Sequence, residues 1–278
     1  MVLFRILALG GGGTKGFLHI GALQELESRV GNLTTHFSRG IYGCSIGSLL
    51  ATGIAFGLNI VQMERLSKKC MNMMFVFDGM NVASLSMATT KKGVISMDSF
   101  ESHILSAFDS EGIDLRDKYL SDAKIPLYVT ASNMTRGVPT IFKDRVHIIS
   151  ALKASCCIPF LFQPQIIGNS VYLDGGLITN DLHKLIPKED QADTLSIYLI
   201  HSNPHITPAG LEKLSSTEYA YKLYKTVCLY DRAQHYDKNI LELYYAGSGF
   251  TDKSDEEKDE MITAGRCLMR SFLAKRTS

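Results

Sequence analysis

Residues 41–50, with the sequence IYGCSIGSLL, decide the expected fold of this chain. The stretch begins as a short apolar strand, passes through a Gly-x-Ser-x-Gly turn and continues as an apolar helix. In such a turn the central serine occupies a strained corner that exposes its hydroxyl above the sheet, and the flanking Gly43 and Gly47 allow other backbone to approach closely. The pattern therefore predicts that Ser45 is a nucleophile.

A glycine-rich loop precedes this turn in the sequence. Residues 4–9 form a short β-type run, Gly10–Gly13 are consecutive glycines, and residues 14–26 have the apolar spacing of a helix. Such a loop at a helix N-terminus presents backbone N–H groups to an anion. Because adjacent parallel strands bring their carboxyl ends to one edge of a sheet, we expect this loop to lie beside Ser45 and to act as an oxyanion hole.

Other interpretations of the glycine loop stay open at this stage. Gly11, Gly13 and Gly16 satisfy the G-x-G-x-x-G pattern of a dinucleotide-binding turn, but the next strand runs into the serine turn instead of ending in an acidic residue. A phosphate-binding P-loop needs Gly-Lys-Ser/Thr, and Thr14-Lys15-Gly16 has the reverse order. A nucleotide-binding protein and a glycine turn needed only for packing are therefore the alternatives.

The base that activates the serine must lie within hydrogen-bond reach of its hydroxyl. Asp174 follows the apolar run at residues 171–173 and precedes Gly175 and Gly176, which let the backbone approach another loop. We therefore expect Asp174 at the carboxyl end of a strand, where the active sites of α/β proteins form. A turn or helix-cap role is its alternative, because Asp-Gly is a strong turn signal.

Histidine offers a second candidate for the base. In an α/β-hydrolase the histidine follows both the serine and the acid in the sequence. His201 and His205 come nearest to that pattern, because they follow the strand expected at residues 194–200. A Ser-His-Asp esterase is therefore an alternative mechanism, to be decided by geometry rather than by sequence order.

The composition is that of an ordinary globular protein. Of the 278 residues, 45% are hydrophobic and 21% are charged, and the formal net charge of +1 gives no electrostatic basis for binding nucleic acid. The six cysteines have no metal-type C-x-x-C spacing and no carboxylate or histidine cluster suggests calcium or zinc, so we expect neither a metal nor another cofactor. Without a secretory signal the thiols are expected to be reduced, which indicates a cytoplasmic protein.

An uncharged segment at residues 41–61 has about the 20 residues that a membrane-spanning helix requires. Its glycines and polar residues, however, make it a poor continuous helix in lipid. A buried strand, turn and helix explain the same apolarity. We therefore expect no transmembrane segment.

Strand and helix patterns alternate along residues 3–203. This alternation predicts an α/β fold, a three-layer sandwich with a mostly parallel sheet between helices. The last strand is expected at Thr194–Ile200, and the region 208–278 is expected to be helical, mostly so from Gly210 to Tyr245 and again in a final helix with a Ser-x-x-Glu cap. All 278 residues are expected to form a single domain.

Four short motifs resemble those of the patatin-like phospholipases, intracellular lipid acyl hydrolases with a Ser–Asp dyad. They are similar, in order, to the oxyanion loop, the nucleophile elbow, an Ala-Ser-x-x-x-Pro segment and an Asp-Gly-Gly/Ala motif of that family. The motifs are GGGTKG at residues 11–16, GCSIG at 43–47, ASCCIP at 154–159 and DGG at 174–176, followed by Asn180. Each motif is short, but their order is specific, and together they extend over roughly two thirds of the chain.

The resemblance implies an enzyme that cleaves acyl-ester bonds of phospholipids or related lipids. Ser45 would attack the ester carbonyl, Asp174 would take its proton, and water would later hydrolyse the acyl-enzyme. No step needs a metal or another cofactor. Such a substrate implies peripheral association with a membrane surface, while the acyl chain, the head group and the oligomeric state stay open.

The remaining site residues follow from the same resemblance. They are Gly11, Gly12, Gly13, Lys15 and Gly16 in the oxyanion-binding loop, and Gly43, Gly47, Gly175 and Gly176 in the turns that carry the dyad. For Lys15, a role in orienting the loop and a solvated side chain on the first helical turn are equally open. Residues 73–77 are hypothesised to contact lipid, with buried core as the alternative. A catalytically silent lipid-binding protein on the same fold is the third function class.

Overall fold

The computed structural model of the chain describes residues 4–71, 92–201, 206–214, 219, 222–224, 226, 238–246 and 253–276. The strands are β1 (Ile6–Leu9), β2 (Gly40–Cys44), β3 (Gly93–Ile95), β4 (Leu127–Asn133), β5 (Val138–Phe142), β6 (Phe160–Phe162), β7 (Gln165–Ile167), β8 (Ser170–Asp174), β9 (Thr194–His201) and β10 (Ile240–Tyr245). The longer helices are α1 (Gly16–Val30), α3 (Ile46–Ala55), α4 (Ile60–Cys70), α7 (Met97–Asp109), α8 (Ile148–Cys156) and α13 (Asp255–Ala274). The short helices are α2 (Leu33–His36), α9 (Leu182–Leu185), α10 (Lys188–Gln191) and α11 (Pro208–Leu211), with 3-10 turns η1 (Gly13–Lys15), η2 (Leu120–Asp122) and η3 (Gly175–Leu177).

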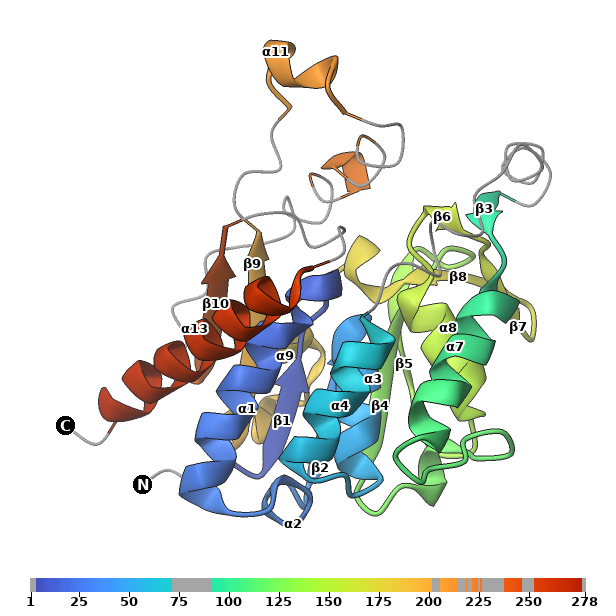
Figure 1. The fold of residues 1–278 in the computed structure, drawn as a ribbon. Helices are drawn as coiled ribbons and strands as arrows, with labels where there is room; N and C mark the ends of the chain where they lie inside the picture. The colour runs from blue at the N-terminus through green and yellow to red at the C-terminus, as the bar shows by residue number, and fades with distance from the viewer. Residues whose placement is uncertain are drawn as a thin grey trace.

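A mostly parallel sheet forms the centre of the fold (Figure 1). Its strand order is β10-β9-β1-β2-β4-β8-β7, with β5 also paired to β4. The pairings from β10 through β4 are all parallel, whereas β5 and β8 pair antiparallel with β4, and β7 pairs antiparallel with β8. The predicted α/β class with a mostly parallel sheet is confirmed.

Both faces of the sheet are covered, but unequally. On β1, Leu7 and Leu9 join the large core that contains residues of α1, α3, α4, α7 and α8. Ile6 and Ala8 point to the other face, where a smaller core includes Leu182 of α9. Because successive residues of a strand alternate between faces, this central strand is apolar throughout, as expected for a strand buried on both sides.

The C-terminal part of the chain contains a strand that the sequence interpretation missed. β10 pairs in parallel with β9, so the prediction of a mostly helical stretch up to Tyr245 is wrong, and β9 is not the last strand. Leu241 and Leu243 are buried, whereas Glu242 and Tyr244 are exposed, which is the two-residue period of an edge strand. The mixed tyrosine spacing of this region concealed that short period.

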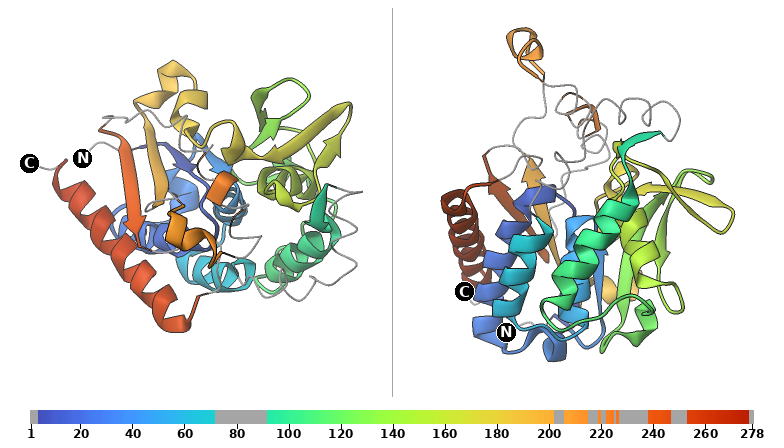
Figure 2. Two further views of the ribbon diagram at one scale, coloured as in Figure 1. Left: turned by 90° about the horizontal axis from the view of Figure 1, so that it is seen from above. Right: turned by 45° about the vertical axis from the view of Figure 1, so that its right-hand side comes forward.

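The final helix, α13, is capped as predicted by Ser254 and packs along α1 (Figure 2). Glycines make the close approach of the two helices possible. A Cβ atom at Gly21 of α1 would lie 1.8 Å from the carbonyl oxygen of Ile262, and one at Gly265 of α13 would lie 2.1 Å from the carbonyl oxygen of Leu18. The close packing of α1 against α13 therefore depends on direct contact between their backbones at Gly21 and Gly265.

Replacing Gly265 with alanine tests this crossing. The added methyl group has no space at the carbonyl oxygen of Leu18, so we expect the helices to separate and the free energy of unfolding to fall by about 1–3 kcal/mol. Urea unfolding followed by circular dichroism measures the change. Ser271→Ala, at an exposed position of the same helix, is the matched control, and equal stability of the two variants would contradict the role of the glycine.

His19 fastens the start of the glycine loop to α1. Its side chain is fully buried and donates the Nε2–H to the carbonyl oxygen of Gly10 at 3.0 Å. Burial lowers the pKa of His19 to about 4, because the charged imidazolium is poorly solvated there. The imidazole is therefore neutral at pH 7, with its proton on Nε2.

This buried imidazole predicts a defined loss of stability in acid. The unfolded chain takes up a proton at His19 below the ordinary pKa of 6.5, whereas the folded protein does so only at about 4. Between those values the free energy of unfolding should fall by up to about 3 kcal/mol from this group alone. Urea titrations from pH 7.5 to pH 4 should show this fall reduced in His19→Gln, which keeps an N–H donor, and parallel pH curves would contradict the assignment.

Candidate active site

Strands β2 and β8 meet end to end along one edge of β4. Cys44, at the end of β2, pairs with Thr130, and Asp174, at the end of β8, pairs with Ala131, the next residue of β4. The other edge of β4 is taken by β5, which pairs with both of these β4 residues. β2 and β8 therefore share an edge and approach each other head-on, and Ser45 is the residue that follows the β2 end facing Asp174.

The route by which Asp174 reaches this point differs from the expected one. Asp174 does lie at the carboxyl end of a strand, but that strand is antiparallel to β4 and not one of the parallel set. Parallel strands would have placed the two carboxyl ends side by side at one edge of the sheet. β8 instead runs antiparallel to β4, and its carboxyl end lies one β4 residue away from the carboxyl end of β2.

Ser45 stands on the strained turn that the sequence predicted. Its φ of 52° and ψ of −127° are unfavourable for a residue with a side chain. The Ser45 N–H donates to Oγ of Ser155 at 2.9 Å, and its carbonyl oxygen accepts from Oγ of Ser48 at 2.6 Å. Glycine is needed on both sides, because a Cβ atom at Gly43 or Gly47 would lie within 2.4 Å of neighbouring backbone.

Asp174 is held in one orientation from several directions. Only 1% of the residue is exposed, and its carbonyl oxygen accepts from Oγ of Ser132 at 2.8 Å. Oδ1 of its carboxylate accepts from the N–H of Gly176 at 2.9 Å and from the hydroxyl of Tyr224 at 2.7 Å. A buried carboxylate bound by such donors keeps a fixed orientation beside the serine.

The glycine loop passes directly against Ser45. A Cβ atom at Gly11 would lie 2.9 Å from Cβ of Ser45. Asn180 clamps this part of the loop, because its side chain accepts from the N–H of Gly11 at 2.8 Å and donates to the carbonyl oxygen of Gly11 at 3.2 Å. The N–H of Gly11 is therefore engaged within the protein, and Gly13, with a φ of 61°, turns the loop into the helix.

Lys15 is fully buried, so the alternative of a solvated side chain is wrong. Its Nζ donates to the carbonyl oxygens of Tyr245 at 2.9 Å and Ile200 at 3.4 Å. These acceptors lie at the carboxyl ends of β10 and β9. The side chain thus ties the glycine loop to the two outer strands of the sheet.

A small apolar pocket, partly open to solvent, adjoins the serine. It is lined by Gly13, Thr14, Ser45, Ile46, Leu49, Cys70, Met71, Phe100, Cys156, Ile158 and Phe162. None of these side chains is charged. Such a lining accommodates a hydrocarbon chain and offers no cation to a phosphate group.

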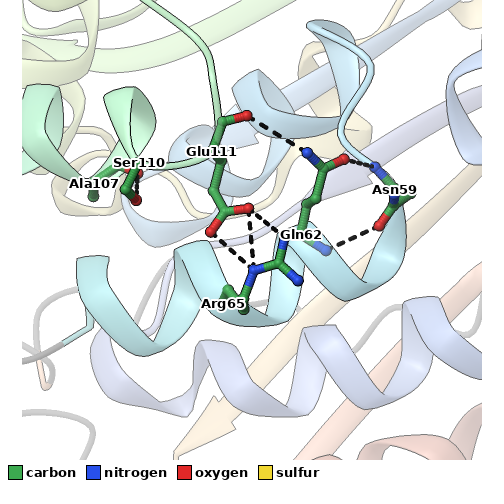
Figure 3. Close-up of polar contacts among 6 residues, drawn as sticks. All are labelled: Asn59, Gln62, Arg65, Ala107, Ser110 and Glu111. Atoms are coloured by element: carbon green, nitrogen blue, oxygen red, sulfur yellow. Dashed lines mark hydrogen bonds and ion pairs between the residues drawn. The ribbon is translucent and has the colours of Figure 1, made fainter.

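Two helices that contribute to the cavity are joined to each other away from it (Figure 3). Arg65 of α4 donates three hydrogen bonds to the carboxylate of Glu111, just beyond α7, the shortest at 2.7 Å. Gln62 lies beside this pair and completes a capping box with Asn59 at the start of α4. The residues of these helices that line the cavity are Cys70 of α4 and Phe100 of α7, so the ion pair joins the two helices without itself lining the cavity.

Histidines with described side chains after Ser45 bond elsewhere. His103 contacts the carbonyl oxygen of Lys69, and His147 contacts that of Arg116. His183 bonds Oγ of Ser196 in the smaller core. Of the two histidines favoured by the sequence, the side chain of His201 and the whole of His205 lie outside the described residues.

Two buried thiols beside the candidate dyad, those of Cys156 and Cys157, are held in the neutral form. Burial and the neighbouring Asp174 raise the pKa of Cys157 to about 12, and the same causes raise the pKa of Cys156 well above its ordinary value. Cys44, next to the serine, is fully buried in the smaller core. The Cys156 and Cys157 thiols are therefore not poised as nucleophiles.

Within the described residues, no group of three or more His, Cys, Asp or Glu side chains could hold a metal ion. Among the helices of this described part, none combines the length and the apolar character needed to cross a membrane. Residues 73–77, hypothesised to contact lipid, lie outside the described residues.

The sequence interpretation missed two side chains that support the site. Tyr224 reaches Asp174 from the C-terminal region, where no motif indicated a role. Asn180 was noted as part of a motif, but its clamp on the glycine loop was not foreseen. Its position six residues after Asp174 was the available signal, whereas a hydrogen bond between distant segments leaves no local pattern for Tyr224.

Comparison with known proteins gives several matches. Residues 7–185 match the family Patatin-like phospholipase. The chain is 26% identical over 187 residues to the probable lipid hydrolase 463L of Invertebrate iridescent virus 6, covering 64% of this chain and 61% of that protein. It is 27% identical over 199 residues to the cUMP-AMP-activated phospholipase of Escherichia coli, covering 64% and 56%. The chain thus spans about three fifths of the length of these curated relatives.

Among solved structures, VipD from Legionella pneumophila has the same fold. The TM-score is 0.58 at 15% sequence identity, over 98% of this chain and 67% of that one. This likeness concerns the fold alone. The family match, by contrast, covers more than half of the chain and includes both Ser45 and Asp174, and the chain therefore belongs to the patatin-like phospholipase family.

Proposed function

We propose that this chain is a serine acyl hydrolase that cleaves acyl-ester bonds of phospholipids or related lipids with Ser45 and Asp174 as a dyad. The observation that supports the proposal is that β2 and β8 end at consecutive residues of β4, Thr130 and Ala131, with Asp174 at one end and Ser45 following the other. The relatives named as phospholipase and lipid hydrolase support the reaction class.

The chemistry needs two steps. Ser45 Oγ attacks the ester carbonyl carbon while the carboxylate of Asp174 takes its proton, and the alcohol leaves with a proton from the same acid. A water molecule, deprotonated by Asp174, then attacks the acyl-enzyme carbonyl; the bond from the acyl group to Ser45 Oγ breaks, Oγ takes the proton back from Asp174, and the fatty acid is released. The buried carboxylate is suited to this task because its donors hold it in place.

Backbone N–H groups of the glycine loop stabilise the oxyanion in this proposal. The N–H of Gly11 is donated to Asn180, so the loop's remaining donors, at Gly12 and Gly13, are assigned to the oxyanion. A well-placed donor of this kind contributes on the order of 3 kcal/mol to the transition state in comparable hydrolases. Lys15 and Asn180 act on this step only by fixing the loop.

The apolar cavity beside Ser45 takes the acyl chain of the substrate. Its uncharged lining favours a hydrocarbon chain over a nucleotide phosphate at this glycine loop. The substrate resides in a membrane, so the protein works there as a peripherally associated enzyme. Neither the dyad nor the loop requires a metal or another cofactor.

Ser45→Ala and Asp174→Asn test the dyad. Each should lower phospholipid hydrolysis by at least about a thousandfold, because a serine without its base is a poor nucleophile. Fluorophosphonate labelling should mark wild-type Ser45, fall sharply in Asp174→Asn and vanish in Ser45→Ala. Fatty-acid release from mixed phospholipid vesicles and mass spectrometry of the labelled peptide provide the measurements.

Cys44→Ser serves as the matched control beside the nucleophile and should remain active. Substantial hydrolysis by Asp174→Asn would instead revive a histidine base such as His201 or His205. An unlabelled serine together with tight binding of NAD or ATP in calorimetry would favour a nucleotide-binding protein.

Leu49→Phe tests the assignment of the cavity. Leu49 is buried in α3 and lines the cavity, so a larger ring there should shorten the space for the acyl chain. We expect kcat/KM for long-chain esters to fall at least about tenfold more than for short-chain esters. Leu211→Phe, at an exposed position of α11, is the control, and an equal effect on all chain lengths would contradict the assignment.

A further inference from the structure

The C-terminal region supplies a side chain to the candidate dyad. Tyr224 is 5% exposed, and its hydroxyl donates to Oδ1 of Asp174 at 2.7 Å. The same oxygen accepts from the N–H of Gly176 at 2.9 Å. The family match ends at residue 185, so this contact comes from a part of the chain beyond the matched region.

The Tyr224 hydroxyl also lies close to the backbone of Gly176. A Cβ atom at Gly176 would lie 3.0 Å from the Tyr224 oxygen, closer than side chains normally approach. Gly176 therefore leaves room for the phenol to reach the carboxylate. The turn after β8 and the tyrosine fit together around one oxygen atom of Asp174.

We propose that Tyr224 is the positioning residue of the general base, an inference that rests on the proposed acyl hydrolase function. With Oδ1 bound by two donors, the carboxylate cannot rotate without losing both hydrogen bonds. Oδ2 is then the oxygen that receives the proton of Ser45 Oγ. The phenol takes no part in the transfer.

Tyr224 also sets the pH range in which the base is charged. A hydrogen bond donated to a carboxylate favours its charged form, so losing the Tyr224 donor should raise the pH at which the base becomes charged. Asp174 raises the pKa of the neighbouring Cys156 and Cys157 thiols, which burial also raises, so these two neighbours stay neutral. Changes at Tyr224 should therefore appear in the acidic limb of the pH–rate profile.

Tyr224→Phe is the test, since it removes the hydroxyl and keeps the ring. We expect kcat for vesicle phospholipid to fall on the order of tenfold and the acidic limb to move up by on the order of one pH unit. The pH dependence of fluorophosphonate labelling at Ser45 should move in the same direction, which gives a readout that needs no lipid. Tyr219→Phe, at an exposed position of the same region, is the matched control and should leave both profiles unchanged.

Tyr224→His, which restores an N–H donor on a ring, should return the acidic limb toward the wild-type position. Thermal unfolding of each variant separates a folding defect from a positioning defect, and the histidine variant carries the comparison if the phenylalanine variant does not fold. An unchanged acidic limb in the folded variants, or an equal shift with and without a donor, would overturn the role of Tyr224. The proposed function would survive that result, whereas wild-type protein without hydrolysis or labelling would remove the function itself.

Discussion

The site depends on the register with which two strands share one edge of β4. β2 delivers the serine and β8 delivers the aspartate, and both stop at consecutive positions of the same neighbour. Backbone hydrogen bonds, rather than side-chain contacts, thus set the relation between the two residues of the proposed dyad. Sheet hydrogen bonds in a buried core break only together, so this relation is as rigid as the fold allows.

A second set of contacts fixes the glycine loop against that pair. Asn180 holds Gly11, His19 holds Gly10, and Lys15 reaches carbonyl oxygens at the ends of β9 and β10. Buried polar groups are costly unless they are hydrogen-bonded, and here each of these side chains bonds a backbone group of the loop or of the strand ends beside it. The loop conformation is therefore prepared before any substrate arrives, which is the condition for an effective oxyanion hole.

Sequence reasoning reached the parts of this arrangement that local chemistry dictates. The Gly-x-Ser-x-Gly turn was predictable because the strained φ of Ser45 and the close backbone at its flanking glycines demand those residue types within five positions. Asp174 was predictable from an apolar run that ends in Asp-Gly-Gly. The antiparallel direction of β8 was not, because a short apolar strand reads the same in either direction.

Long-range contacts account for the rest of what the sequence did not reveal. Lys15 and the strand end at Tyr245 lie far apart in the chain, so the burial of that lysine follows only from the folded sheet. β10 escaped notice since its two-residue period spans only a few residues among mixed tyrosines. No sequence pattern around Tyr224 indicates that its hydroxyl bonds Asp174, 50 residues earlier in the chain.

Because β2 and β8 both pair with β4, the length of β4 fixes the distance between the two strand ends. Loops between Ser45 and Asp174 can change length without changing this distance, because the strand ends are positioned by their pairing with β4. An insertion of one residue between Thr130 and Ala131 would instead move the two strand ends apart by about 3.3 Å, the rise of one strand residue. Length variation between Ser45 and Asp174 should therefore be tolerated more readily in the connecting loops than within β4.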